Sequence, residues 1–257
     1  MMSVNLNERE LRRYHRQIMI PEIGPEGQER IKYAKVLVVG AGGLGCPILQ
    51  YLSAAGVGTL GIMDNEKVDE SNLQRQLLYG INDIGKLKAI IARQRLMELN
   101  NLPEYKVLNI LLTENNALEI IPEYDIVVDA TDNFESRYLI SDACVILKKP
   151  MVYGSIYKFE GQVSVFNYKN GPSLRCLNPC PPEESEAPVP SDVGVIGVLP
   201  GIIGSMQANE VLKIILEKGN ILSGKLQIID IFNHRNYSIQ IKPNPKNLSR
   251  KKLQENY

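Results

Sequence analysis

The chain has 257 residues, enough to bury a sizeable hydrophobic core, and we expect one large α/β domain. Lys plus Arg and Asp plus Glu each number 29, so the net charge is zero and gives no reason to expect nucleic acid or a membrane as partner. Four cysteines are too few for a disulfide framework in a chain of this length, which favours a reducing, cytoplasmic setting.

The first 150 residues alternate between segments typical of helices and segments typical of buried strands. Residues 36–63 carry no charge but hold seven glycines and a proline, so we expect strand, turn, helix and strand there rather than a membrane span. Helices are predicted over 7–18, 23–33, 44–55, 86–100 and 115–121, and strands over 36–39, 60–63, 107–112 and 126–129. This alternation predicts βαβ units and a Rossmann-like, mostly parallel sheet flanked by helices.

After residue 150 the strands follow one another more closely. Residues 151–157 and 162–168 predict an antiparallel hairpin, and 225–231 with 237–241 predict a last β pair. A helix is predicted between these pairs, over 200–218, and a surface loop over 179–192, where five prolines and four acidic residues gather. We therefore expect one domain over 1–241 that continues into an antiparallel β-rich half, and a frayed tail over 242–257.

A glycine-rich turn joins the first predicted strand to the helix that follows it. Gly40, Gly42 and Gly45 fit the G-x-G-x-x-G pattern, in which glycines permit a tight bend and let phosphate approach the backbone. The N-terminus of the next helix offers free N–H groups to an anion. Asp64, at the end of the second predicted strand, lies where a carboxylate accepts hydrogen bonds from ribose hydroxyls. Together these features indicate a nucleotide site.

Polar side chains further along the chain indicate a polyphosphate with a divalent metal. They are Asn72, Arg75, Gln76, Lys88, Asp132 and Asn133. Asp132 follows a predicted strand at its carboxyl end, where open α/β sheets bind ligands, and its carboxylate suits Mg²⁺. Arg75 and Lys88 would neutralise the charge that builds on a leaving pyrophosphate. We therefore predict a site that acts on the phosphates of ATP, with Asp132 as the Mg²⁺ ligand.

Five blocks of sequence, taken in order, resemble the signature blocks of the ThiF/MoeB family. The blocks are residues 13–18, 40–45, 71–76, 85–88 and 129–133, within a resemblance that runs from about residue 11 to 241. These adenylyltransferases act on small ubiquitin-like sulfur carriers of thiamin and molybdopterin synthesis and are related to the ubiquitin-activating enzymes. The resemblance implies a nucleotide-binding part over about 34–150 and a carrier-docking part over about 151–241.

The resemblance also implies the residues of the nucleotide site. Those expected to bind ATP are Gly40, Gly42, Gly43, Asp64, Ser71, Asn72, Leu73, Gln74, Arg75, Gln76, Lys88, Asp132 and Asn133. In this family the arginine that matches Arg16 reaches into the nucleotide site of the neighbouring subunit, so a homodimer is implied. Arg16 thus joins Arg75, Lys88 and Asp132 among the expected catalytic residues.

The implied substrate is a carrier protein that ends in Gly-Gly. Its terminal carboxylate, with a pKa of about 3.5, is ionised at neutral pH and needs no general base. The reaction instead requires placement of the carboxylate against the α-phosphorus and relief of the repulsion between two anions. The expected products are an acyl-adenylate and pyrophosphate.

The cysteines depart from the family's pattern. Many members carry two C-x-x-C pairs that bind a structural zinc, but here Ser173 stands at the first position and no cysteine follows Cys180. Because a structural zinc takes four ligands and only Cys176 and Cys180 lie near each other, we expect no zinc. Some relatives use a loop cysteine for sulfur or thioester transfer. Acidic residues at 183, 184 and 186 would raise the pKa of the Cys180 thiol and disfavour that role.

Three other functions fit parts of the sequence. An NAD(P)-dependent oxidoreductase would use the turn at 40–45 and Asp64, but it leaves Arg16, Arg75 and Asp132 without a role. A non-catalytic partner subunit is disfavoured because the phosphate-facing residues are all present in one chain. Adenylation of a short peptide that ends in a carboxylate is the third alternative.

Overall fold

The computed structural model describes residues 5–182, 194–254 and 257. The strands are β1 Lys35–Val39, β2 Thr59–Met63, β3 Glu104–Leu108, β4 Ile126–Asp129, β5 Met151–Tyr157, β6 Glu160–Phe166, β7 Lys225–Asp230 and β8 Arg235–Gln240. The α-helices are α1 Glu8–Arg13, α2 His15–Ile18, α3 Gly24–Tyr33, α4 Gly45–Ala55, α5 Lys88–Leu99, α6 Ala117–Ile120, α7 Phe134–Leu147, α8 Leu174–Leu177, α9 Val198–Leu216 and α10 Pro245–Leu248. Short 3₁₀ helices are η1 Glu70–Asn72, η2 Ile81–Asp83 and η3 Ile121–Glu123.

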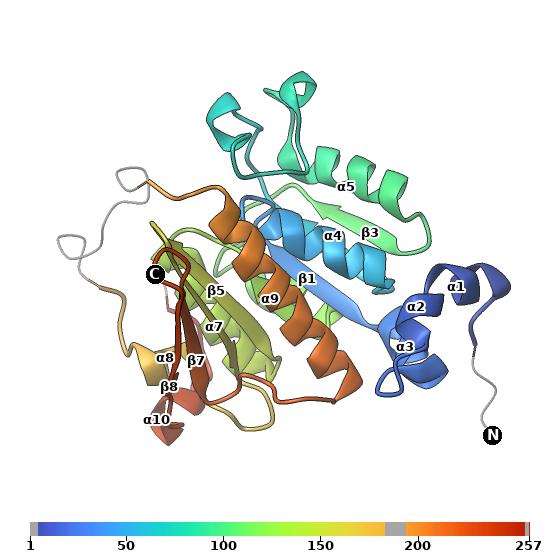
Figure 1. Ribbon diagram of the computed structural model, residues 1–257. Helices are drawn as coiled ribbons and strands as arrows, with labels where there is room; N and C mark the ends of the chain where they lie inside the picture. The colour runs from blue at the N-terminus through green and yellow to red at the C-terminus, as the bar shows by residue number, and fades with distance from the viewer. Residues whose placement is uncertain (1–4, 183–193, 255–256) are drawn as a thin grey trace.

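Within the described residues, eight strands form one sheet with helices on both faces (Figure 1). Their order is β3-β2-β1-β4-β5-β6-β7-β8. Neighbouring strands from β3 to β5 are parallel, and those from β5 to β8 are antiparallel. This confirms the predicted Rossmann-like sheet that continues into an antiparallel half.

The central parallel strands are buried on both faces, which explains their uninterrupted apolar sequence. In β1, Val36 and Val38 join the core under α4, α5 and α9, whereas Leu37 and Val39 join the core under α6 and α7. Figure 1 shows α4 and α9 on one side of the sheet and α7 behind it. The uncharged segment 36–63 thus becomes β1, α4 and β2. No helix within the described residues is both long and apolar enough to cross a bilayer.

Helix α9 connects the parallel and antiparallel halves of the sheet. It packs against α4, β5 and β6. A Cβ added at Gly204 would lie 2.6 Å from the Leu44 carbonyl oxygen, so glycine permits the close approach of α9 to α4. The side-chain amide of Gln207 donates to the carbonyls of Asp129 and Val152, at 2.8 and 3.4 Å. The carboxyl end of β4 is therefore tied to α9 and β5.

Two predicted elements differ from the structure, and one helix of the structure was not predicted. The helix predicted over 7–18 is wrong as one element, because it is broken at Tyr14, whose buried hydroxyl accepts a hydrogen bond from Asn100. The strand predicted over 107–112 is shifted, because β3 begins at Glu104 and ends at Leu108. Strand β3 pairs only with β2, and because β2 ends at Met63, opposite Leu108, the chain leaves the sheet there. Helix α7 was not among the predicted elements.

The predicted frayed tail is wrong for the part of it that the structure describes. Helix α10 lies in this tail, and Asn247 donates to the Arg175 carbonyl. Arg250 and Tyr257 contact the buried carboxylate of Asp142. Most of the predicted loop 179–192 lies outside the described residues.

Candidate functional site

A cavity of about 710 Å³ opens at the carboxyl ends of β1, β2 and β4 and continues along β5. The chain runs outward from β1 to β2 and β3, then returns to β4 on the other side of β1. Open α/β sheets bind ligands at such a reversal. The predicted residues that line the cavity are Gly40, Gly42, Gly43, Asp64, Asn72, Arg75, Gln76, Lys88, Asp132 and Asn133.

The glycine turn after β1 is held in place from two sides. Gly40 has φ +98°, and a Cβ there would lie 2.5 Å from the Ala130 carbonyl oxygen, so only glycine fits. The Ala41 N–H donates to Asp64 Oδ2 at 2.8 Å, and the Tyr79 hydroxyl donates to the Ala41 carbonyl at 2.7 Å. The turn is therefore a rigid wall of the cavity. Tyr79 was not predicted from the sequence.

Asp64 supports the turn and also faces the cavity. Its Oδ1 accepts from the Glu66 backbone N–H at 2.8 Å. Burial raises the pKa of the Asp64 carboxyl, and the hydrogen bonds from Ala41 and Glu66 oppose that rise. Each carboxylate oxygen has a second acceptor position, which can receive a hydroxyl of a bound sugar.

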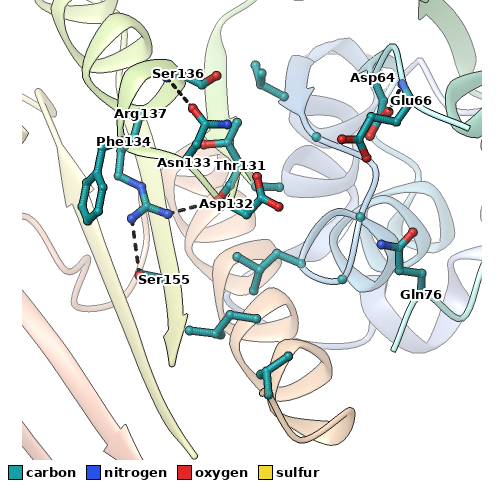
Figure 2. Close-up of a pocket in the computed structure, with 18 of the residues that line it drawn as sticks. Asp64, Glu66, Gln76, Thr131, Asp132, Asn133, Phe134, Ser136, Arg137 and Ser155 are labelled. Carbon is teal, nitrogen blue, oxygen red and sulfur yellow. Dashed lines mark hydrogen bonds between the residues drawn. The ribbon is translucent and has the colours of Figure 1, made fainter. Parts of the chain in front are cut away.

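Lys88 is the first residue of α5, and its ammonium group is already paired. The side chain is 4 % exposed, and Nζ lies 2.6 Å from Glu66 Oε2, on a glutamate side chain that is 68 % exposed. Glu66 lines the cavity beside Asp64, as Figure 2 shows, and was not predicted. A ligand phosphate that binds Lys88 must therefore compete with a carboxylate.

Arg75 and Gln76 follow η1 and line the same wall. Arg75 Nη1 donates to the Ser71 carbonyl at 3.1 Å, and its guanidinium pairs with no carboxylate of the described residues. Gln76 is buried, and its Oε1 has no hydrogen-bond partner among the described residues. Leaving such an atom unpaired costs about 1–3 kcal/mol, so a ligand donor would be favoured there.

Asp132 and Asn133 belong to the loop between β4 and α7. Asp132 is exposed and lines the cavity with its carboxylate unburied (Figure 2). Asn133 is the N-cap of α7, because its side-chain oxygen accepts from the Ser136 N–H at 2.8 Å. Asn133 thus also has a structural role that its sequence position did not reveal.

Four predicted residues do not line the cavity. Ser71, in η1, donates from its N–H and its hydroxyl to the carboxylate of Asp69, the N-cap of η1. Leu73 packs against the core, and Gln74 backs onto Gly197 at the start of α9. Arg16 is exposed on α2, which packs on α3 beside the amino end of β1. Arg16 is therefore remote from the carboxyl ends that form the cavity of its own chain.

The structure adds a buried cation to the cavity wall that sequence reasoning missed. Arg137, in α7, forms a 3.1 Å ion pair with Asp129, the last residue of β4. It also reaches Ser155 in β5 (Figure 2). A basic residue inside a helix normally indicates a solvated face, so no local signal in the sequence identified Arg137.

The thiol of Cys176 has two polar contacts, one with Ser173 and one with the backbone at Asn244. Its Sγ lies 3.5 Å from Ser173 Oγ and accepts from the Asn244 N–H at 3.2 Å. Across the described residues, no three His, Cys, Asp or Glu side chains gather closely enough to hold a metal. The absence of zinc stays a prediction. Cys180 is an exposed free thiol, and the acidic residues that follow it lie outside the described segments.

Comparison with solved structures concerns the fold. The crystal structure of Escherichia coli MccB with AMPCPP and MccA superposes with a TM-score of 0.81 and 20% sequence identity. The match covers 94% of this chain and 74% of MccB. It shows that the two chains share this mixed α/β architecture.

Comparison of sequences gives closer relatives. The sulfur carrier protein adenylyltransferase of Thermus thermophilus is 49% identical over 242 residues, which cover 92% of this chain and 89% of that protein. A probable molybdopterin-synthase adenylyltransferase of Porphyra purpurea is 51% identical over 216 residues, or 84% of this chain and 56% of that protein. This chain thus spans little more than half of the Porphyra protein. The model of the ThiF family matches residues 14–250, nearly the whole chain. The chain therefore belongs to the ThiF family.

Proposed function

We propose that this protein is an adenylyltransferase of the ThiF/MoeB type, which uses ATP to adenylate the C-terminal glycine carboxylate of a ubiquitin-like sulfur-carrier protein. The observation that carries the proposal is the convergence of the glycine turn, Arg75, Lys88 and Asp132 on one cavity. The name of the Thermus relative, which matches over most of both chains, supports the substrate class.

The cavity wall fits the parts of ATP. Gly42 and Gly43 leave room for phosphates to approach the backbone, and Asp64 offers acceptors to the ribose. The unpartnered Oε1 of Gln76 supports a polar ligand at this wall. In this proposal Asn72, Arg75 and Lys88 contact the polyphosphate. Ser71, Leu73, Gln74 and Asn133 then support the site without being its main contacts.

A magnesium ion fits the same wall through Asp132. Mg²⁺ in nucleotide sites keeps several waters and takes one or two carboxylates besides the substrate phosphates. The exposed, cavity-lining carboxylate of Asp132 suits that arrangement without a cluster of protein ligands. When bound, the ion would supply positive charge to the phosphate oxygens.

The proposed chemistry needs few residues because the nucleophile is already an anion. A carboxylate oxygen of the carrier forms a bond to the α-phosphorus, the bond from the α-phosphorus to the bridging oxygen breaks, and pyrophosphate leaves with that electron pair. No proton moves. Arg75 and Lys88 would offset the charge on the leaving group, and Lys88 must exchange Glu66 for phosphate.

The proposal includes a second subunit and a docking region. Because Arg16 is exposed and remote from the cavity of its own chain, a homodimer would let it serve the site of the partner. The carrier would dock on the part over about 151–241, whose β5–β6 hairpin contributes Tyr157, Lys158 and Gln162 to the cavity. The four free thiols suit a reducing cytoplasm.

Carrier-dependent ATP–pyrophosphate exchange tests this function. Arg75→Ala and Asp132→Ala should each lower the exchange rate by roughly 10²-fold or more, because each removes charge stabilisation of the phosphates. Arg93→Ala and Glu135→Ala, at exposed positions that do not line the cavity, should leave the rate unchanged. Full exchange activity in either of the first two variants would contradict the assigned roles.

Nucleotide preference separates this proposal from the oxidoreductase alternative, which the names of the relatives do not favour. Binding of ATP with Mg²⁺ should raise the Tm, and NAD should not. Exchange with carriers that end in Gly-Gly, but not with short free peptides, is expected for the proposed substrate. Stabilisation by NAD alone would overturn the proposal.

A further inference from the structure

Arg137 is a buried cation whose hydrogen bonds join two parts of the cavity wall. It is 7 % exposed, and its partner Asp129 is 0 % exposed. Arg137 Nε donates to Asp129 Oδ2 at 3.1 Å, and Nη2 donates to the Thr131 and Gly154 carbonyls at 3.0 and 3.4 Å. Nη1 donates to Ser155 Oγ at 3.4 Å. The guanidinium thus spans the loop after β4 and the middle of β5, as Figure 2 shows.

Two aromatic rings lie within cation–π distance of this guanidinium. The Arg137 Cζ lies 5.7 Å from the ring centroid of Phe134 and 5.1 Å from that of Tyr153. Such contacts hold the cation from both α7 and β5. A lysine in this place would keep the charge but would lose the planar fork that reaches several acceptors at once.

The Asp129 carboxylate also binds the loop that follows β4. Its Oδ1 accepts from the Thr131 N–H at 3.0 Å and from the Thr131 hydroxyl at 2.6 Å. Thr131 is therefore bound through its N–H, its hydroxyl and its carbonyl to one buried ion pair. Asp132, the next residue, starts from a fixed backbone although its own side chain is exposed.

From these contacts we infer that Arg137 is a positioning residue of the reaction, which fixes the places of Asp132 and Ser155 in the cavity wall. The inference rests on the proposed adenylation. Both residues line the cavity, Asp132 from the loop after β4 and Ser155 from β5. Loosening the pair would displace the Asp132 carboxylate relative to the phosphates, and a displacement of about 1 Å can lower a rate by roughly 10²-fold.

A second buried ion pair on α7 provides a matched control. Arg175 donates to both oxygens of the α7 residue Asp142, at 2.8 and 3.0 Å, and lies over the ring of Tyr138. Neither Arg175 nor Asp142 lines the cavity. Arg175→Lys therefore disturbs a comparable pair in the same layer and should lower stability without affecting the loop at Asp132.

The experiment measures ATP binding by titration calorimetry, with EDTA and with Mg²⁺, in the wild type, Arg137→Lys and Arg175→Lys. In Arg137→Lys we expect metal-free affinity within about twofold of wild type, loss of roughly tenfold in the Mg²⁺-dependent gain, and a kcat for exchange lower by roughly 10²-fold. In Arg175→Lys both affinities should match wild type. Should Arg137→Lys fail to fold, the neutral double variant Arg137→Gln with Asp129→Asn is measured for the same loss.

Two results would overturn the inference. One is an Arg137→Lys protein that keeps both the Mg²⁺-dependent gain and kcat. The other is an equal loss in Arg175→Lys, which would show that any buried pair on α7 has this effect through stability alone. A wild-type protein that binds no ATP under either condition would instead refute the proposed function, and this inference with it.

Discussion

The ion pair between Lys88 and Glu66 places its two charges in different surroundings. Lys88 is buried, whereas the Glu66 side chain is 68 % exposed and free to move away. Because the Glu66 carboxylate stays largely in water, its attraction to Lys88 is partly screened, and a phosphate of higher charge can displace it. We predict that Glu66→Gln tightens ATP binding by roughly two- to fivefold in titration calorimetry.

A control for this prediction lies close by in the sequence. Glu70 is exposed in η1 and does not line the cavity, so Glu70→Gln should leave ATP affinity unchanged. Weaker ATP binding in Glu66→Gln would show instead that the carboxylate orients Lys88 toward the phosphates.

At the residue scale, sequence reasoning succeeds where a function depends on local backbone. Gly40 and Asp64 were expected at the turn and at the strand end, and both line the cavity. Arg137 and Glu66 were missed, because each acquires its partner only through the folded chain: Asp129 from β4 for Arg137, and Lys88 from α5 for Glu66. A sequence pattern cannot distinguish charged residues that form such ion pairs in the fold from charged residues that face solvent.

At the scale of elements, the contact between α9 and α4 depends on one small residue. A Cβ at Gly204 would meet Leu44 O and Pro47 Cγ, each at 2.6 Å. Gly204→Ala should therefore push the helices apart and lower the free energy of unfolding by about 1–3 kcal/mol, seen as a Tm lower by several degrees. A Cβ added at Gly201, in the same helix, would have no other heavy atom within 4 Å outside its immediate neighbours and the helix backbone. Gly201→Ala should keep or raise the Tm, because alanine favours a helix by about 1 kcal/mol.

Strands were predicted correctly where the pattern of apolar residues and the short connection to the next strand both indicated an antiparallel pair. The hairpin β5–β6 and the pair β7–β8 were expected, and each forms antiparallel pairs. The range predicted for the third strand, 107–112, lies too far along the chain. The apolar run continues through Ile110 and Leu111, but these residues leave the sheet after β3 and line the cavity. Ile110 and Leu111 are exposed, so the apolar run overstated both burial and pairing, and the length of β2 decides where pairing stops.

At the scale of the whole molecule, two hydrophobic cores lie on opposite faces of one sheet, and each contains a cysteine. Cys46 belongs to α4 and Cys144 to α7. Burial raises the pKa of Cys46 to about 12 and raises that of Cys144 as well, so neither thiol reacts in the native state near neutral pH. Exposed Cys180 should react with a thiol reagent at once.

We predict that Cys46 and Cys144 become reactive together as denaturant is raised, because α9 and the continuous sheet couple the two faces. The measurement is thiol labelling with mass spectrometry, in a variant with Cys176→Ser and Cys180→Ser. Earlier labelling of Cys144 would contradict a single cooperative transition and indicate that the layer with α7 opens separately.

The strand order has a consequence for how such a protein diversifies. One end of the cavity is built on short parallel strands and their turns, and the other on the β5–β6 hairpin with Tyr157 and Lys158. Mutations in the hairpin can accumulate while the glycine turn and the strand ends stay intact, so under the proposed function a lineage can exchange one acceptor for another and retain its nucleotide site.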